Sequence, residues 1–368
     1  MTLQLIVDYI VWSPNQAVFP SFERLRWYSL LFAFGFIISQ QVMIHIYRKE
    51  GQDDNLVDKL TIYMVLATII GARLGHVLFY EPEKYLSNPI EILKVWEGGL
   101  ASHGAAIAIL FALYLYARKV PTQTYLWVVD RIVIVVALTG ALIRIGNLMN
   151  SEIGGKPTGT DSGFVYARDS EEILETLRIP VQEVRAYKPD NRESELTGTG
   201  IVPVNIDIKI EKGGFSEADL KTTLETDVKY ALTRFKSSQK YMAESANAPL
   251  NIVLVDKGDH YLATVYTFGV ARYPTQIYEA ASYFVIFLVL LWLWITYKSR
   301  LPDGLLLGLF LISVFGMRFV WEYLKENQVD FEQELTLNMG QWLSIPLVIG
   351  GLILVGLALK KGFNAKIN

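Results

Sequence analysis

The sequence of 368 residues contains no cysteine. This absence excludes disulfide bonds, thiolate metal sites and a cysteine nucleophile, and it leaves the redox compartment open. Charge is also scarce, because 19% of the residues are charged, against about 25% in ordinary soluble domains. With 52% apolar residues and a mean hydropathy of +0.29, the composition indicates a membrane protein.

Other familiar signals are missing too. The net charge of −3 gives no indication of nucleic-acid binding. The first 20 residues lack a basic stretch, an apolar core and a small-residue cleavage site in that order, so we do not interpret them as a removed signal peptide. No spacing of His, Asp and Glu suggests a metal site, and there is no Gly-x-Ser-x-Gly elbow or phosphate-binding glycine loop. We therefore expect neither a metal nor a cofactor.

Long apolar segments dominate what is present. A helix needs about 20 mostly apolar residues to cross a bilayer, and seven segments qualify: 28–47, 60–80, 99–117, 126–149, 278–297, 304–323 and 340–359. Basic residues follow the first, third, fifth and seventh of them, as at Arg48, Arg118, Lys298 and Lys360. Because Lys and Arg are enriched in cytoplasmic loops, the sequence predicts a polytopic α-helical membrane protein with seven transmembrane helices, its N-terminus outside and its C-terminus inside.

The region between the fourth and fifth segments is polar and has no span. Strands are predicted from alternating or apolar runs at 202–210, 250–255 and 261–270. Ser216 is expected to cap an amphipathic helix that runs to about Lys236. We therefore expect an inserted α+β domain outside the membrane. The predicted division is 1–155 for the first four helices, 156–270 for the insertion and 271–368 for the last three helices.

Polar residues interrupt the fourth span at its outer end. Arg144, Asn147 and Asn150 lie three residues apart, which places them near one helix face, and Glu152 follows. Such groups are costly in lipid and normally face a polar cavity. A planar guanidinium can bind phosphate or carboxylate oxygens through two parallel hydrogen bonds. The alternative is a structural Arg–Glu pair that extends to the membrane interface.

Four further residues carry chemistry. Arg318 and Glu322 share a helix face in the sixth span, and they form either a second phosphate clamp or an ion pair that satisfies itself. His103, which lies among glycines, can act as a general base because imidazole titrates near neutrality, or it can be structural. Arg73 lies within a span and needs a partner.

The polar candidates converge on one depth. Glu279 and Gln341 open the fifth and seventh spans, where a helix dipole would also favour a carboxylate, and Tyr28 starts the first span, where an aromatic belt is expected. With the N-terminus outside, the candidates in the outer half are Tyr28, His103, Arg144, Asn147, Glu152, Glu279, Arg318, Glu322 and Gln341. Unrelated structural roles would not be expected to gather there, so we predict one polar site.

These residues resemble the bacterial prolipoprotein diacylglyceryl transferases. The family run Gly-Arg-x-Gly-Asn-Phe-x-Asn-x-Glu-x-x-Gly matches residues 143–155, except that Ile143 replaces the first Gly and Leu148 replaces the Phe. Further segments occur in family order: 26–30, 71–75, 98–104, 272–280, 318–322 and 340–346. The resemblance covers all seven predicted spans, whereas the region 156–270 is larger than expected for the family.

The resemblance implies a transferase that moves the diacylglyceryl group of phosphatidylglycerol to the lipobox cysteine thiol of a preprolipoprotein, forming a thioether and releasing glycerol phosphate. It implies a multi-pass enzyme of the bacterial inner membrane that catalyses the first step of lipoprotein maturation. Its active site would face the extracytoplasmic side. The expected partners are phosphatidylglycerol, the signal peptide of the substrate and the bilayer, without nucleic acid, and the enzyme is expected to be a monomer.

The resemblance also implies roles for single residues. A thiol attacks only after losing its proton, for which His103 is the first choice and Glu152 the second. Arg144 and Arg318 would stabilise the leaving phosphate, with Glu322 orienting Arg318. Binding of lipid or peptide is expected of Tyr28, Arg73, Asn147, Asn150, Gly155, Glu279 and Gln341.

Two other classes of function remain as alternatives. A membrane transporter or lipid-headgroup carrier would use the same polar groups to line a path, although we find no inverted repeat in the sequence. A membrane scaffold would use the polar region 156–270 to bind a partner.

Overall fold

The computed structural model describes residues 8–19, 22, 25–95, 98–326 and 336–363. The chain forms two compact units. The first unit comprises Met1–Leu30, Arg144–Glu279 and Val320–Asn338. The second unit comprises Leu31–Ile143, Ala280–Phe319 and Met339–Asn368.

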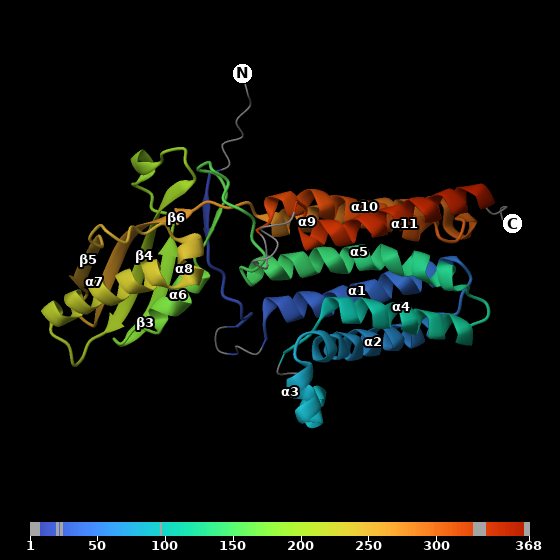
Figure 1. The fold of residues 1–368 in the computed structure, drawn as a ribbon, viewed down its shortest axis with the longest axis horizontal. Helices are drawn as coiled ribbons and strands as arrows, with labels where there is room; N and C mark the ends of the chain where they lie inside the picture. The colour runs from blue at the N-terminus through green and yellow to red at the C-terminus, as the bar shows by residue number, and fades with distance from the viewer. Residues whose placement is uncertain (1–7, 20–21, 23–24, 96–97, 327–335, 364–368) are drawn as a thin grey trace, which may run out of the picture. The chain divides into compact units, whose positions relative to one another are not determined.

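Long helices account for most of the apolar sequence (Figure 1). They are α1 (Trp27–Lys49), α2 (Asn55–Phe79), α4 (Ser102–Lys119), α5 (Tyr125–Met149), α9 (Thr275–Tyr297), α10 (Leu305–Trp321) and α11 (Met339–Lys361). Within the described residues, all of these except α4 are long and apolar enough to cross a membrane. Large apolar side chains on them, such as Ile62, Trp292 and Leu352, are more than half exposed, as expected of surfaces that face lipid. The chain is therefore a polytopic helical membrane protein.

The helix α4 is shifted along the sequence relative to the predicted span 99–117, and it ends at Lys119. It begins at Ser102, since Gly98 and Gly99 have φ angles of 91° and 70°, in the left-handed region that interrupts a helix, and Ala101 is extended. This helix has 18 residues, and it is not among the described helices whose length and composition together would let them cross a membrane. The number of seven spans therefore stays a prediction.

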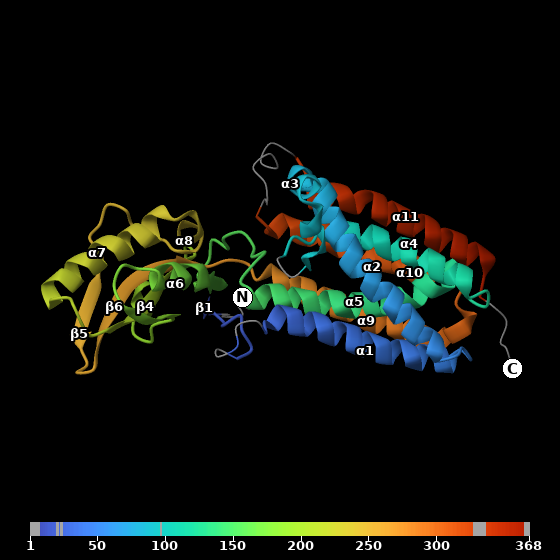
Figure 2. The same ribbon diagram turned by 90° about the horizontal axis from the view of Figure 1, so that it is seen from below.

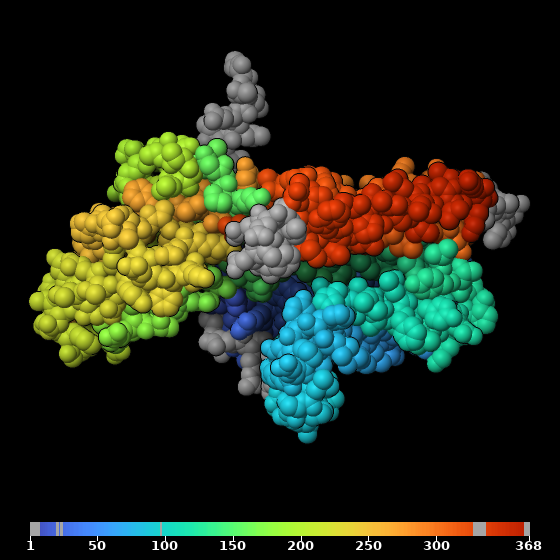
Figure 3. All heavy atoms as spheres, in the orientation of Figure 1, coloured from blue at the N-terminus to red at the C-terminus, as the bar shows by residue number. Residues whose placement is uncertain are grey.

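Glycines allow α2 and α4 to pack closely, and both views show the two helices side by side (Figures 1 and 2). A Cβ atom on Gly104 would lie 2.3 Å from the carbonyl oxygen of Gly71 and 2.6 Å from the Cα atom of Gly75. Small residues four positions apart, such as Gly71 and Gly75, are common where membrane helices pack closely. After α2, the short helices α3 (Pro82–Ser87) and η1 (Pro89–Leu93) project from the second unit (Figure 3).

Buried charges near the start of α5 are satisfied inside the second unit. Arg131 and Glu50 form an ion pair of 2.9 Å with almost no exposure, and the indole of Trp294 donates to the same carboxylate. Asp130 accepts hydrogen bonds from the backbone N–H groups of Gly304 and Leu307, which caps the first turn of α10. These groups thus have a structural role, at about 20 Å along the helix axis from Arg144.

The first unit contains a four-stranded antiparallel sheet in the order β3-β4-β6-β5. Its strands are β3 (Val181–Tyr187), β4 (Ile201–Glu211), β5 (Ile252–Asp256) and β6 (His260–Val270), and its helices are α6 (Arg168–Glu175), α7 (Glu217–Arg234) and α8 (Lys236–Tyr241). The helix α7 covers one face of the sheet (Figures 1 and 2). Its Leu224 and Val228 join Ile206 and Ile208 of β4 in one core. Ser216 caps α7, as predicted, by accepting from the N–H of Asp219.

A second, smaller sheet was not predicted. The strand β1 (Ile10–Trp12) pairs in parallel with β2 (Phe164–Tyr166), far away in the sequence. The indole of Trp12 donates a hydrogen bond of 2.9 Å to the carbonyl of Leu148. The N-terminal segment is thereby connected to the end of α5.

Candidate functional site

The polar end of α5 forms a connected row of side chains. Arg144 donates from Nη1 to Oδ1 of Asn147 at 3.2 Å, and Nδ2 of Asn147 donates to Oε1 of Glu152 at 2.7 Å. Asn150 donates to the same carboxylate oxygen at 3.3 Å. The spacing of three residues that predicted a common face for Arg144 and Asn147 therefore corresponds to direct contact. Asn147 is buried, whereas the Glu152 residue is exposed.

The backbone after this row is strained, and side chains from another helix hold it in place. Ser151 and Ile153 have φ angles of 54° and 59°, which are unfavourable for residues other than glycine and most costly for the β-branched Ile153. The first turn of α9 stabilises this conformation: Gln276 donates to the carbonyl of Glu152 at 2.7 Å, and Thr275 donates to that of Ile153 at 3.0 Å. The position of Glu152 is thus fixed by the start of the next helix.

A buried charge network continues from Arg144. We use this name for Arg144, Glu279, Lys325 and Glu322. Nε of Arg144 lies 3.2 Å from Oε2 of Glu279, and Nζ of Lys325 lies 2.8 Å from its Oε1 and 3.2 Å from Oε1 of Glu322. Asn338 donates to the other oxygen of Glu322 at 3.1 Å. Two cations and two carboxylates balance each other, which a buried cluster requires.

Gly155 gives the network its backbone support. Its N–H donates to the carbonyl of Tyr273 at 2.9 Å, and it forms a β-bridge with Lys325. A Cβ atom at this position would lie 2.6 Å from the oxygen of Tyr273 and 2.9 Å from that of Leu324. Only glycine therefore allows the segment that carries Lys325 to approach so closely.

A second cluster fixes the same segment. Arg272 donates to the carbonyl of Gly155 at 3.0 Å and pairs with Glu326. Lys240 lies 2.7 Å from Glu326. Although burial opposes ionisation, the hydrogen bonds from Lys240 and Arg272 lower the pKa of Glu326. The chain on both sides of Lys325 is thus held by ionic contacts.

Tyr28 packs against Gly146 of the signature run, by which we mean residues 143–155. A Cβ atom on Gly146 would lie 2.8 Å from Cδ2 of Tyr28 and 3.3 Å from its Cα atom. The absence of a side chain at Gly146 therefore allows the first turn of α1 to approach α5.

The other predicted site residues belong to the second unit. Arg73 is buried, and its guanidinium donates to the carbonyls of Glu91, Ile92 and Gly98, so that it holds the loop before α4. His103 is exposed in the first turn of α4, with its ring centroid 5.1 Å from that of Phe79.

Gln341, in the first turn of α11, is buried and donates to the carbonyl of Phe319 at 3.4 Å, and Arg318 lies near the end of α10. The structure therefore gathers eight of the twelve predicted residues in the first unit and leaves four in the second.

Lys325 is the member of the charge network that sequence reasoning missed. It is 4% exposed at its side chain, and it connects two carboxylates that are 46 and 3 residues away. As a lysine just beyond an apolar segment, it looked like an ordinary loop residue. Its spacing of three from Glu322 was the one available signal, because such pairs share a helix face.

The guanidinium of Arg144 keeps one edge open. Its Nε and Nη1 are engaged by Glu279 and Asn147, and across the described parts of the chain no hydrogen bond engages Nη2. The side chain is 18% exposed. Such a fixed, partly exposed cation is suited to an anionic oxygen of a ligand.

Comparisons with known proteins agree with the family resemblance that residues 143–155 show. The sequence pattern of one family, described as prolipoprotein diacylglyceryl transferase, matches residues 17–357. A protein of Tolumonas auensis is 36% identical over 337 residues, covering 92% of each chain, and one of Porphyromonas gingivalis is 33% identical over 367 residues, covering 98% of each. Both are named phosphatidylglycerol–prolipoprotein diacylglyceryl transferase.

These alignments bear on the size of the polar region 156–270. Since they span nearly the whole of both chains, the relatives have almost the same length, and the large region does not set this chain apart from them. A protein of Chloroherpeton thalassium with the same name is 32% identical over 96% of each chain. The chain belongs to the prolipoprotein diacylglyceryl transferase family.

Proposed function

We propose that this chain transfers the diacylglyceryl group of phosphatidylglycerol to the thiol of a cysteine in a prolipoprotein. The observation that carries the proposal is the fixed guanidinium of Arg144 at the end of the signature run, in a chain of this family. In the reaction the cysteine sulfur forms a bond to the glycerol carbon, and the bond from that carbon to the phosphate oxygen breaks. The phosphate leaves with the electron pair as glycerol phosphate, and the thiol proton goes to a base.

The chemistry defines a direct test against the alternatives. Purified protein is expected to consume phosphatidylglycerol only when a cysteine-bearing signal peptide is supplied, and to add the mass of one diacylglyceryl group to that peptide. A peptide with serine in place of cysteine is the matched control. Movement of lipid without a thioether product would instead favour a carrier.

Arg144 provides the main stabilisation of the leaving phosphate in this proposal. Nη2 meets the phosphate oxygen, while Glu279 and Asn147 keep the guanidinium in place before the substrate arrives. Preorganised donors of this kind are the largest single source of rate enhancement in many enzymes. Arg318 acts as the second cation, oriented by Glu322.

The remaining residues are proposed to have one of two roles, binding of the substrates or positioning of other groups. Tyr28, Asn147, Asn150 and Gln341 are proposed to hold the glycerol headgroup or the peptide backbone. Arg73, Gly155 and Glu279 are proposed to position other groups: Arg73 holds the loop before α4, Gly155 lets the Lys325 segment approach, and Glu279 holds Arg144 and Lys325.

The base is proposed to be His103, with Glu152 as the second candidate. A positioned base contributes about 10²–10⁴ in rate, so we expect His103→Gln to lower kcat by that factor and to remove the dependence of kcat on imidazole ionisation. The matched variant Glu152→Gln should keep that dependence. A pH profile of kcat for both variants measures this. Activity close to wild type in His103→Gln, together with a flattened profile in Glu152→Gln, would give the role to Glu152.

We propose that the chain crosses the inner membrane seven times, with α4 as the third span, its N-terminus and the polar region 156–270 outside and its C-terminus inside. Basic residues end α1, α4 and α11, which supports this orientation because such residues stay in the cytoplasm.

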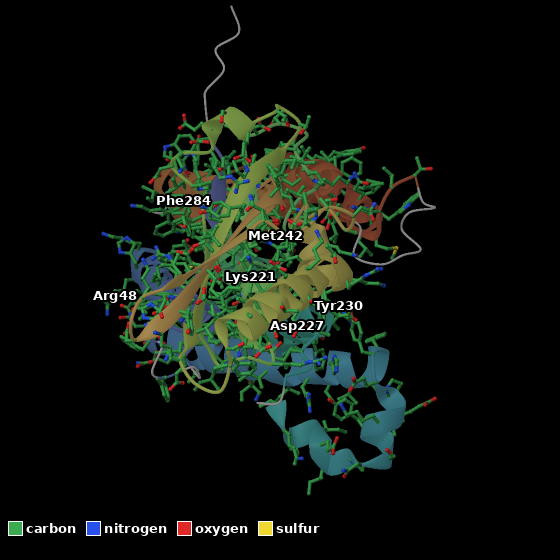
Figure 4. All side chains as sticks on the ribbon, turned by 90° about the vertical axis from the view of Figure 1, so that its left-hand side faces the viewer. Arg48, Lys221, Asp227, Tyr230, Met242 and Phe284 are labelled. Carbon is green, nitrogen blue, oxygen red and sulfur yellow. The ribbon has the colours of Figure 1, made fainter. Side chains whose placement is uncertain are left out.

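The absence of cysteine makes the orientation easy to test. In whole cells, a membrane-impermeant maleimide is expected to label Lys221→Cys on α7 and to leave Arg48→Cys at the end of α1 unlabelled. Both wild-type residues are exposed (Figure 4). Labelling of both variants after the membrane is permeabilised is the control. The reverse pattern in intact cells would exclude the proposed orientation.

A further inference from the structure

An open groove lies in the first unit, apart from the charge network. Its volume is about 910 Å³, and its walls are the N-terminal segment around β1, the helix α6 and the strand β3. Four basic and four acidic side chains line it, so their formal charges cancel. A net cationic pocket would suit an anionic lipid headgroup, whereas this balanced lining suits a polypeptide backbone.

The strand β3 offers main-chain groups to this groove. It is an outer strand of the sheet, and edge strands present unpaired N–H and C=O groups. The N–H of Ala186 points away from β4, because it donates to Oε1 of Glu171 at 2.5 Å. The N–H of Ala186 is therefore occupied by Glu171. Because backbone direction alternates by residue in such a ladder, the N–H of Val184, which also lines the groove, points the same way, and among the described residues no side chain engages it. An extended peptide can add to an edge of this kind.

Glu171 ties two walls of the groove together. One oxygen accepts from Ala186 on β3, and the other accepts from the hydroxyl of Ser13 beyond β1. Burial raises the pKa of Glu171, and these hydrogen bonds oppose the shift. The walls are therefore held at a fixed spacing, which is what a preformed binding site needs.

The groove is connected to the signature run. Arg168, which lines it, donates to the carbonyl of Asn150. Six residues of helical rise separate Asn150 from Arg144, or about 9 Å. An extended peptide covers this with about three residues at roughly 3.3 Å each. A polypeptide with its cysteine at Arg144 thus needs only a short stretch to reach Arg168.

We propose that this groove binds, as an extended strand beside β3, the part of the substrate polypeptide that follows the acceptor cysteine. This inference rests on the proposed transferase function. It gives the enzyme a specificity site for the segment after the cysteine, in addition to the site for the cysteine itself.

Peptide length provides the first test. One lipobox peptide ends two residues after the cysteine, and a second continues for about ten residues more, enough to pass Arg168 and pair along β3 at roughly 3.3 Å per residue. The longer peptide is expected to have a KM about tenfold lower, equivalent to roughly 1.4 kcal/mol, with kcat unchanged. Equal KM values in an active enzyme would overturn this inference alone. No transfer to either peptide would instead overturn the proposed function, and this inference with it.

Photo-crosslinking provides the second test. A photoreactive residue introduced as Arg185→p-benzoylphenylalanine on β3 is expected to capture the longer peptide and not the shorter one. The control is Tyr230→p-benzoylphenylalanine, an exposed position on α7 (Figure 4), which should capture neither. Capture of phospholipid or of a second copy of this chain at position 185, in place of the peptide, would show a different occupant and overturn the proposal.

Discussion

Replacement of Arg144 with alanine is expected to lower kcat/KM for diacylglyceryl transfer by about 10²–10³, the usual cost of removing one preorganised donor. The variant should remain folded, because Glu279 keeps its contact of 2.8 Å with Lys325 and is not left without a cation. Mass measurement of the lipobox peptide after reaction gives the rate, and a thermal unfolding curve of the same sample reports the fold.

Two further variants sharpen this prediction. Arg144→Lys keeps the charge but loses the planar fork, so it should recover only part of the activity. Arg118→Ala, at an exposed arginine in the last turn of α4, is the matched control and should behave as wild type. If Arg144→Ala stays within about threefold of wild type, a barrier change below 1 kcal/mol, the guanidinium does not stabilise the phosphate.

The sequence was informative where the pattern is local. The fourth span, predicted at 126–149, is α5 at Tyr125–Met149, because a long apolar run can only be a helix in lipid. The cap at Ser216 was also local, since it depends on residues three positions apart.

Local sequence patterns could not predict contacts between segments that are distant in the sequence. The strands β1 and β2 have three residues each and are separated by about 150 positions, so neither shows a usable alternation. Glu279 is a similar case: the helix dipole was a sufficient local explanation, whereas its carboxylate in fact pairs with Arg144 and Lys325. Periodicity reveals which residues lie on the same face of a helix or strand, but it does not reveal which other segment packs against that face.

Removal of the amine in Lys325→Met is expected to destabilise the first unit by about 3–5 kcal/mol, the cost of leaving a buried charge without its partner. Lys325 is 4% exposed at its side chain and is shared by Glu279 and Glu322. In this variant Glu279 keeps its contact with Arg144, and Glu322 keeps its hydrogen bond from Asn338.

A double-mutant cycle separates charge from packing in this network. Adding Glu322→Gln to Lys325→Met removes the excess negative charge, so the double variant should be more stable than Lys325→Met alone, with a coupling of about 1–3 kcal/mol. Unfolding curves of the wild type, both single variants and the double variant measure this, with Lys221→Met on the exposed face of α7 as the control. Strict additivity would show that Lys325 and Glu322 do not stabilise each other, and the charge network would then end at Glu279.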